Sequence, residues 1–383
     1  MLTDDQYSIL SLIRKSFGVS HGDVTICDPQ AAARTIENSG ILLTVYKALP
    51  ADLQEILKEP YYKTLKQSIL QGRVGTQALN ALADAGLRCI GLKGWELRNL
   101  YPDFTMRQMS DLDILVNPYS FGAISAVMKK MGYRGGTKES SSKQNSFRNK
   151  EVHIEMHKRL TDESGSIRQW EDGIWGRAMR TDHENIWRMC PEDFCIYHFL
   201  HLYRHFMHGA IGLRRIIDTW LLQKLKFSQD AVRAALDGFG IGLFYDRMVK
   251  LGAVCMGEAP MDEESEILLT HAFAHGVYGS EKSYKSCRIA AMSSRSVTAG
   301  KFNAAMNAVF PPFSHMKTCF PILQRFPVLL PYCWIKRLVR YLKRSMKKNK
   351  KKLDYSGIDD QDYWEMKRFF AAGGVDLQKG VYP

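Results

Sequence analysis

Two aspartates, Asp111 and Asp113, stand one residue apart at the start of an apolar run. The sequence Asp-Leu-Asp-Ile-Leu-Val at residues 111–116 predicts a buried β-strand. Because residues i and i+2 of a strand point to the same face, the two carboxylates should lie together. Like charges this close repel unless a cation lies between them, and Mg²⁺ prefers such oxygen ligands. Taken alone, however, a pair of this kind is more often a solvated strand end.

A second alternating stretch, His-Ile-Glu-Met-His, occupies residues 153–157. On a strand, His153, Glu155 and His157 share one face. If this strand lies beside the first, Glu155 completes a three-carboxylate metal site with the two aspartates. Glu155 would then act as general base, or as ligand of a metal that activates the acceptor hydroxyl, with the histidines as phosphate contacts or orienting groups. The alternative is a polar strand surface without a ligand.

A phosphate-binding turn is predicted at Lys93 and Gly94, between a strand at 87–92 and a short helix. The glycine lets a phosphate approach the backbone, and the start of the helix offers free N–H groups. Lys93 adds a positive charge. Arg107, in the loop before the acidic strand, is a second phosphate candidate, and Ser110 is a further candidate for contact with the nucleotide.

Four histidines repeat at spacings of three, four and three in a segment expected to be helical, residues 191–207 and just beyond. They are His198, His201, His205 and His208. One interpretation is that this helix lines the active-site cleft, so that His201, His205 and the nearby Arg214 contact the triphosphate or the acceptor. Two alternatives stay open. The histidines can satisfy local hydrogen bonds at the edge of a core, or an i, i+4 pair can bind a metal ion of its own.

The elements that position these residues form an α+β pattern, with a small mixed sheet between N-terminal and C-terminal helical regions. Helices are expected at 4–16, 51–57, 61–85, 119–131, 191–207, 213–226, 230–239, 242–256 and 263–274, and strands at 87–92, 111–116, 146–148 and 152–157. Residues 280–300 are polar and are expected to form a loop or a weak helix. The expected regions are an N-terminal helical region at 1–85, a core at 86–160, a helical domain at 161–310 and a helical and basic tail at 311–383.

The combination resembles a known family. The segments L-K-G-W-E-L-R-N-L-Y-P from Leu92, R-Q-M-S-D-L-D-I-L-V from Arg107 and V-H-I-E-M-H from Val152 are similar to a bacterial group of uncharacterised nucleotidyltransferases. That group belongs to the polymerase-beta-type nucleotidyltransferase superfamily. The resemblance implies Mg²⁺ or Mn²⁺ as cofactor. It also implies transfer of a nucleotidyl group from a nucleoside triphosphate such as ATP to an acceptor that the sequence does not identify.

The resemblance assigns the glycine turn of the superfamily to Gly94, its paired aspartates to Asp111 and Asp113, and its third carboxylate to Glu155. It continues more weakly through His201, His205, Arg214 and Asp218, and through the Phe-Pro-Pro sequence at residues 310–312. There are two departures. Trp95 follows Gly94 where many members have serine or glycine, and the third carboxylate is Glu. These departures motivate a second hypothesis, a catalytically inactive binding or regulatory protein on the same fold.

The positive charge is concentrated in one segment. The chain carries a net charge of +13, and residues Lys336 to Lys352 include ten Lys or Arg and no acidic residue. This run predicts contact with nucleic acid or with an anionic membrane surface, and the alternative is a solvated helix end. The sequence has no apolar run long enough to predict a membrane-spanning helix and no secretory start. The eight scattered cysteines fit reduced thiols, so a cytoplasmic protein is expected, with peripheral membrane association left open.

Overall fold

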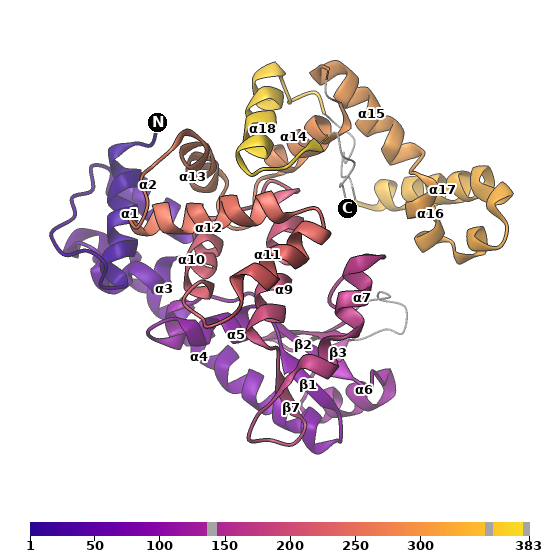
Figure 1. Ribbon diagram of the computed structural model, residues 1–383, viewed down its shortest axis with the longest axis horizontal. Coiled ribbons are helices and arrows are strands. Elements are labelled where there is room, and N and C mark those ends of the chain that lie inside the picture. The colour runs from indigo at the N-terminus through magenta and orange to yellow at the C-terminus, as the bar shows by residue number, and fades with distance from the viewer. Residues whose placement is uncertain (136–143, 294, 349–354, 378–383) are drawn as a thin grey trace. The chain divides into compact units, whose positions relative to one another are not determined.

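The computed structural model describes residues 1–135, 144–293, 295–348 and 355–377 (Figure 1). The chain divides into two compact units. The first, which we call the sheet unit, comprises Met1–Phe206, Ala210–Tyr278 and Ala372–Val375. The second, the C-terminal unit, comprises Met207–Gly209, Gly279–Ala371 and the segment that begins at Asp376.

A mixed sheet of seven strands organises the sheet unit, in the order β3-β4-β5-β2-β1-β7-β6. The strands are β1 (Arg88–Gly91), β2 (Leu112–Asn117), β3 (Arg134–Gly135), β4 (Gln144–Arg148), β5 (His153–His157), β6 (Met179–Arg180) and β7 (Ile186–Arg188). Strand β2 runs antiparallel to β1 but parallel to β5, and β4 returns antiparallel to β5. The predicted α+β class is therefore confirmed.

Helices cover both faces of this sheet. Side chains alternate along β2, so Leu112 and Ile114 point to a core formed with α4 (Ala51–Asp84) and α6 (Phe121–Lys130). Leu115 joins Ile90 of β1 and Leu92, which follows β1, in a second core, which α9 (Pro191–Phe206) closes. Asp113 shares the face of Leu115. Asp113 therefore points toward α9 and away from α4.

The remaining helices of the sheet unit surround these two layers. They are α1 (Asp4–Ser16), α2 (Pro29–Asn38), α3 (Leu42–Val45), α5 (Gly94–Leu97), α7 (Ser166–Asp172), α8 (Ile174–Arg177), α10 (Leu213–Leu222), α11 (Gln229–Gly238), α12 (Gly242–Met256) and α13 (Glu263–His275). Side chains of Ser or Asp cap the first turns of α2, α6, α11 and α13, which satisfies backbone N–H groups that would otherwise lack partners.

The C-terminal unit has only helices as regular structure in its described residues, joined by turns and loops. It contains α14 (Glu281–Met292), α15 (Val297–Val309), α16 (Phe313–Cys319), α17 (Leu330–Lys348) and most of α18 (Asp360–Ala372). The segment 280–300, expected as a loop or weak helix, is for the most part helical, because capping serines start both α14 and α15. None of the helices in the described parts of the chain has the length and apolar character that crossing a bilayer requires.

Candidate active site

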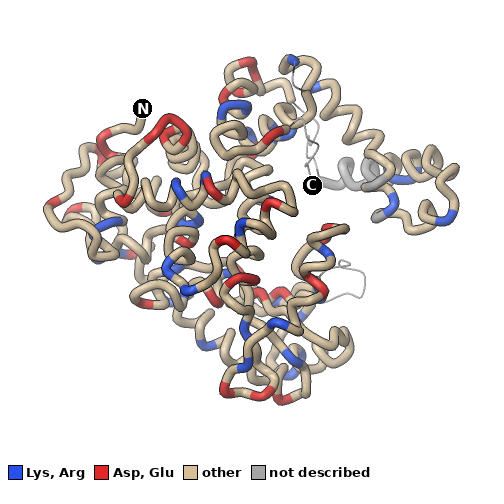
Figure 2. Tube along the Cα trace, in the orientation of Figure 1, with Lys and Arg blue, Asp and Glu red and all other residues tan. Residues whose placement is uncertain are grey.

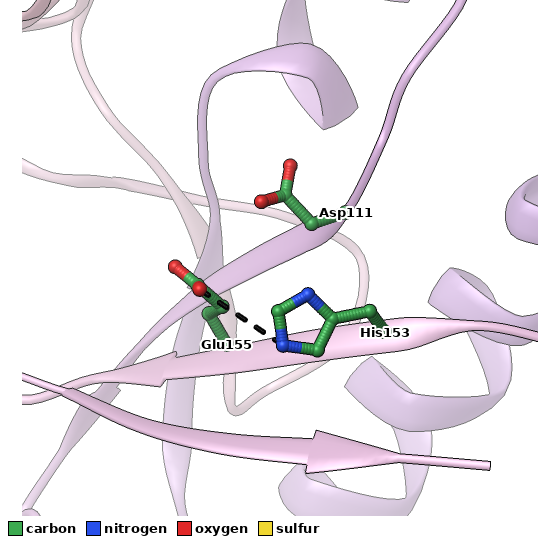
Figure 3. A group of neighbouring side chains, drawn as sticks. All are labelled: Asp111, His153 and Glu155. Carbon is green, nitrogen blue, oxygen red and sulfur yellow. Dashed lines mark ion pairs between the residues drawn. The ribbon is translucent and has the colours of Figure 1, made fainter. Parts of the chain in front are cut away.

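The parallel pairing of β2 with β5 brings the predicted acidic residues together. In this register Asp113 lies opposite Glu155, as expected if the two strands are neighbours. Asp111 stands immediately before β2 and points toward the same edge, beside Glu155 and His153 (Figure 3). One ligand atom from each of Asp111, His153 and Glu155 can be chosen so that all lie within 4.8 Å of one another. Asp113, Glu155 and His157 form a second group of the same kind.

Two partners, Lys93 and His157, hold Asp113 inside this site. Its Oδ1 accepts a hydrogen bond from Lys93 Nζ at 2.6 Å and lies 2.7 Å from Nε2 of His157. Asp113 and His157 are only 3% and 1% exposed. Burial alone would raise the pKa of the Asp113 carboxyl, but the charge of Lys93 and the contact with His157 outweigh it and hold that pKa well below its usual range. Asp113 is therefore ionised in the folded protein.

Asp111 has the opposite electrostatic environment. Burial raises the pKa of its carboxyl, and the negative charge of Asp113 raises it further. The pKa values of the two aspartates are thus shifted in opposite directions. The site stabilises the anionic form of Asp113 and destabilises the anionic form of Asp111. A divalent cation beside both carboxylates would remove this destabilisation, because its charge is larger than any other in the site.

Strand β4 adds a supporting layer that the sequence interpretation missed. Gln144 donates a hydrogen bond from Nε2 to Glu155 Oε2 at 2.6 Å. Ser146, which is paired with Glu155 in the ladder, contacts Nε2 of His153 through its hydroxyl. Gln144 and Ser146 are spaced i, i+2, so they share a face of β4. That alternation of polar residues was the available signal, but the strand was expected to begin only at residue 146.

The Lys93-Gly94 turn has a constrained backbone. Lys93 adopts φ 46°, the one positive φ of a non-glycine residue in the described chain. Such a conformation is costly for a residue with a Cβ and is concentrated at functional sites. At Gly94, a Cβ would lie 2.5 Å from Nη1 of Arg107 and 2.9 Å from the side chain of Met109. Only glycine therefore fits this turn without displacing its neighbours.

The guanidinium group of Arg107 is fixed by an ion pair with Asp218, a residue far away in the sequence. Its Nε and Nη2 each donate to a carboxylate oxygen of Asp218 at 2.8 Å, and the hydroxyl of Tyr101 donates to the same carboxylate at 2.9 Å. Asp218 is 1% exposed. This bidentate pair fixes the guanidinium group so that its remaining nitrogen, Nη1, faces the Gly94 turn.

The bulky side chain of Trp95 does not lie among Asp111, Asp113 and Glu155, which we call the acidic edge. A Cβ added to Gly91 or to Gly75 would lie 2.0 Å and 2.2 Å from atoms of its indole ring. The ring therefore fills a notch between β1 and α4, where it packs against the core on that face. Because Asp113 points to the other face of the sheet, the Trp95 ring lies away from it. The serine hydroxyl that many members of the superfamily have at this position is still absent.

The histidine stripe separates into three environments. His198 faces α10, where its Nε2 lies 3.0 Å from the hydroxyl of Thr219. The Nε2 atoms of His201 and His205 lie 3.2 Å apart. Burial lowers the pKa of His201 well below its usual value, and the positive charge of nearby Lys93 adds to this effect. His208 belongs to the C-terminal unit and stacks on Tyr284.

Arg214 and Ser110, which were also predicted to contact the nucleotide or the acceptor, form hydrogen bonds that anchor a loop. Arg214 donates from Nη1 to the backbone oxygen of Gln108 at 2.9 Å. The hydroxyl of Tyr278 donates to Ser110 Oγ at 3.1 Å. Both interactions hold the loop that leads into Asp111.

His198 makes the stability of the protein depend on pH. Burial lowers its pKa to about 4, against an ordinary value of 6.5. Between these values the unfolded chain binds a proton that the folded chain excludes, so the free energy of unfolding falls as the pH falls through this window. The lowered pKa of His201 acts in the same direction.

We therefore expect His198→Gln to reduce the slope of unfolding free energy against pH by about 1.4 kcal/mol per pH unit within this window. Urea unfolding of both proteins across the window measures it. Equal slopes would show that His198 is not the group that titrates.

The mixed sheet, the neighbouring strands β2 and β5 with their carboxylates, and the adjoining Lys-Gly turn are consistent with a nucleotidyltransferase domain. The chain belongs to a family described as uncharacterised nucleotidyltransferase, whose model matches residues 30–256. The family resemblance inferred from the sequence is thereby confirmed. The matched segment contains the acidic edge, the Lys93-Gly94 turn and Asp218, and it ends before the C-terminal unit continues at Gly279. No match was found among curated proteins or among solved structures.

Proposed function

We propose that this protein is a metal-dependent nucleotidyltransferase whose active centre is formed by Asp111, Asp113 and Glu155. The observation that carries the proposal is the register of β2 on β5, which sets Asp113 opposite Glu155 with Asp111 beside them. Asp111 and Asp113 each form a group of possible ligands with Glu155 and a histidine, and carboxylates of this kind are suited to Mg²⁺ or Mn²⁺. Family membership supports nucleotidyl transfer as the reaction class.

The residues present fit a divalent cation. The raised pKa of Asp111 marks a carboxylate whose negative charge is not balanced within the site. Asp113 is already held ionised, and Glu155 is oriented by Gln144. Asp111, Asp113 and Glu155 would hold the Mg²⁺, which would supply positive charge against the charge that develops on the triphosphate.

The protein's own groups then position the substrates. Lys93 and Arg107 place positive charge at the Gly94 turn, where we place the triphosphate. The acceptor oxygen attacks the α-phosphorus, the bond to the pyrophosphate oxygen breaks, and pyrophosphate leaves. Glu155 accepts the proton of the acceptor hydroxyl or orients that hydroxyl for attack. His157 holds Asp113 in place, and Nε2 of His153 lies 3.9 Å from Oε1 of Glu155.

We propose that the paired histidines His201 and His205 also lie at the substrate site. The influence of Lys93 on the pKa of His201 indicates that α9 adjoins the turn. Burial keeps His201 neutral, so it can offer a hydrogen bond to an acceptor without adding charge. We assign these two histidines to contact with the acceptor or the triphosphate.

A second candidate is a nucleotide-binding regulatory protein that no longer catalyses transfer. Two observations favour it. Asp113 already has Lys93 and His157 as partners, so a metal would have to compete with them. The position after Gly94 has no hydroxyl to contact a phosphate.

Calorimetry with the four nucleoside triphosphates tests the proposal on the full chain. We expect binding that requires Mg²⁺ and is lost in the Asp111→Asn, Asp113→Asn double variant. Incubation with labelled triphosphate and candidate acceptors then separates the two candidates, because only the transferase releases pyrophosphate. A well-folded wild-type protein that binds no triphosphate would contradict both.

A further inference from the structure

A stripe of exposed apolar side chains runs along α17 and the turn before it, within the C-terminal unit. Val328, Tyr332, Ile335 and Val339 follow one another at spacings of four, three and four. This spacing places them on one side of a helix. Their exposed fractions are 83%, 60%, 62% and 44%. Large apolar residues gathered in this way mark an interaction surface, whereas single exposed ones need no explanation.

The opposite side of α17 is already anchored, so the exposed stripe is not left over from a loosely placed helix. Cys333 is buried in a small core with Met316, Phe320 and Leu323. Trp334 donates from Nε1 to the backbone oxygen of Pro311 at 2.9 Å. The segment thus has two apolar sides, one packed within the unit and one facing solvent.

The charge around this stripe has a single sign. Between residues 282 and 353 the sequence contains 17 Lys or Arg and no Asp or Glu. Because the whole chain carries +13, the rest of it has a net charge of −4. Lys and Arg also lie along α16 and the described part of α17, with no acidic residue among them (Figure 2). Lys317, Arg325 and Lys336 pair with no carboxylate among the described residues, and each lies over an aromatic ring instead.

We propose that α17 and the turns before it bind the surface of an anionic lipid bilayer, with the stripe of Val328, Tyr332, Ile335 and Val339 inserted among the lipids. A helix with an apolar side and basic neighbours lies in the plane of the interface, its apolar side in the acyl boundary and its charges at the headgroups. This surface lies outside the matched family segment and does not depend on the proposed function.

A nucleic acid is the rival partner for so basic a segment, and the apolar stripe decides between them. Phosphate backbones attract Lys and Arg but give no reason to expose valine and isoleucine. Base stacking uses aromatic rings, and the stripe has only one, that of Tyr332. Lipid tails, in contrast, offer an apolar environment for all four side chains of the stripe.

Co-flotation of the full chain with vesicles tests the inference. We expect binding to vesicles of phosphatidylcholine mixed with phosphatidylglycerol, and little binding to phosphatidylcholine alone. The Tyr332→Ser, Ile335→Ser, Val339→Ser variant keeps every positive charge, yet it should lose about tenfold or more in affinity. The Lys317→Gln, Arg325→Gln, Lys336→Gln variant should lose about fivefold for each charge that reaches the surface.

A matched control removes apolar residues of similar exposure from the sheet unit. Tyr62, Ile69 and Leu243 are 59%, 51% and 53% exposed, and their replacement by Ser should leave vesicle binding unchanged. Thermal unfolding checks that every variant is folded. The inference is overturned if the α17 serine variant still binds vesicles as wild type does. It is also overturned if the protein binds a single-stranded RNA oligonucleotide but not anionic vesicles.

Discussion

Asp113→Asn is expected to abolish Mg²⁺-dependent nucleotide binding and any transfer that depends on it, with a loss of about a hundredfold or more. The neutral amide cannot balance a divalent cation. It also leaves the ammonium of Lys93, which lies 2.6 Å from Asp113 Oδ1 and whose side chain is 22% exposed, without its carboxylate. Calorimetry measures the binding, and release of pyrophosphate measures the transfer.

Loss of function in this variant has to be separated from loss of folding. An uncompensated buried charge costs about 3–5 kcal/mol, so Asp113→Asn alone will lower stability. The Lys93→Met, Asp113→Asn double variant removes both charges and should recover part of that stability without recovering nucleotide binding. Asp84→Asn, which changes a 75% exposed carboxylate at the end of α4, should behave as wild type. A folded Asp113→Asn variant that still binds nucleotide with Mg²⁺ would rule out our placement of the site.

Asp218→Ala is expected to lower the free energy of unfolding by about 3–5 kcal/mol. The carboxylate of Asp218 receives hydrogen bonds from Arg107 and Tyr101, and all three residues are buried. Its removal leaves a guanidinium group without a counter-charge in the interior. Urea unfolding measures the change.

Two comparisons make the Asp218 prediction specific. The Arg107→Met, Asp218→Leu double variant should be more stable than Asp218→Ala, because neither charge is left unpaired. Glu55→Ala breaks an ion pair with Lys58 whose two side chains are 75% and 55% exposed, and it should leave the free energy of unfolding almost unchanged. If Asp218→Ala costs no more than this surface control, the buried pair is not the support that we describe.

The two strands that carry the acidic edge could be predicted from the sequence, because the pattern that indicates each strand lies within a few neighbouring residues. Asp111 and Asp113 open an apolar strand, and the alternation around Glu155 has period two. The structure confirms that these two strands are neighbours. The family resemblance supplied the order of the elements, which local periodicity alone does not provide.

The contacts that support the site could not be predicted, because they join residues far apart in the chain. Arg107 was interpreted as a phosphate contact, and nothing near it in the sequence indicates Asp218, which lies 111 residues away. Three short strands, β3, β6 and β7, were also missed, since elements of two or three residues carry no measurable period.

Helix α4 shows tertiary packing overriding a local signal. Two helices, 51–57 and 61–85, were expected on either side of Pro60, yet a single helix runs from Ala51 to Asp84 through it. A proline inside a helix loses a backbone hydrogen bond. Burial of Leu53 and Leu57 before it, and of residues from Ser68 onward, holds both halves on one axis and offsets that loss.

Crystals grown with Mn²⁺ and a non-hydrolysable nucleoside triphosphate analogue would test the central claim most directly. Anomalous scattering locates the metal ion without reference to any expected reaction. We predict a peak within coordination distance of Asp111, Asp113 and Glu155, with the triphosphate against the Lys93-Gly94 turn. A peak on His201 and His205 instead, or nucleotide bound away from β2 and β5, would contradict the account.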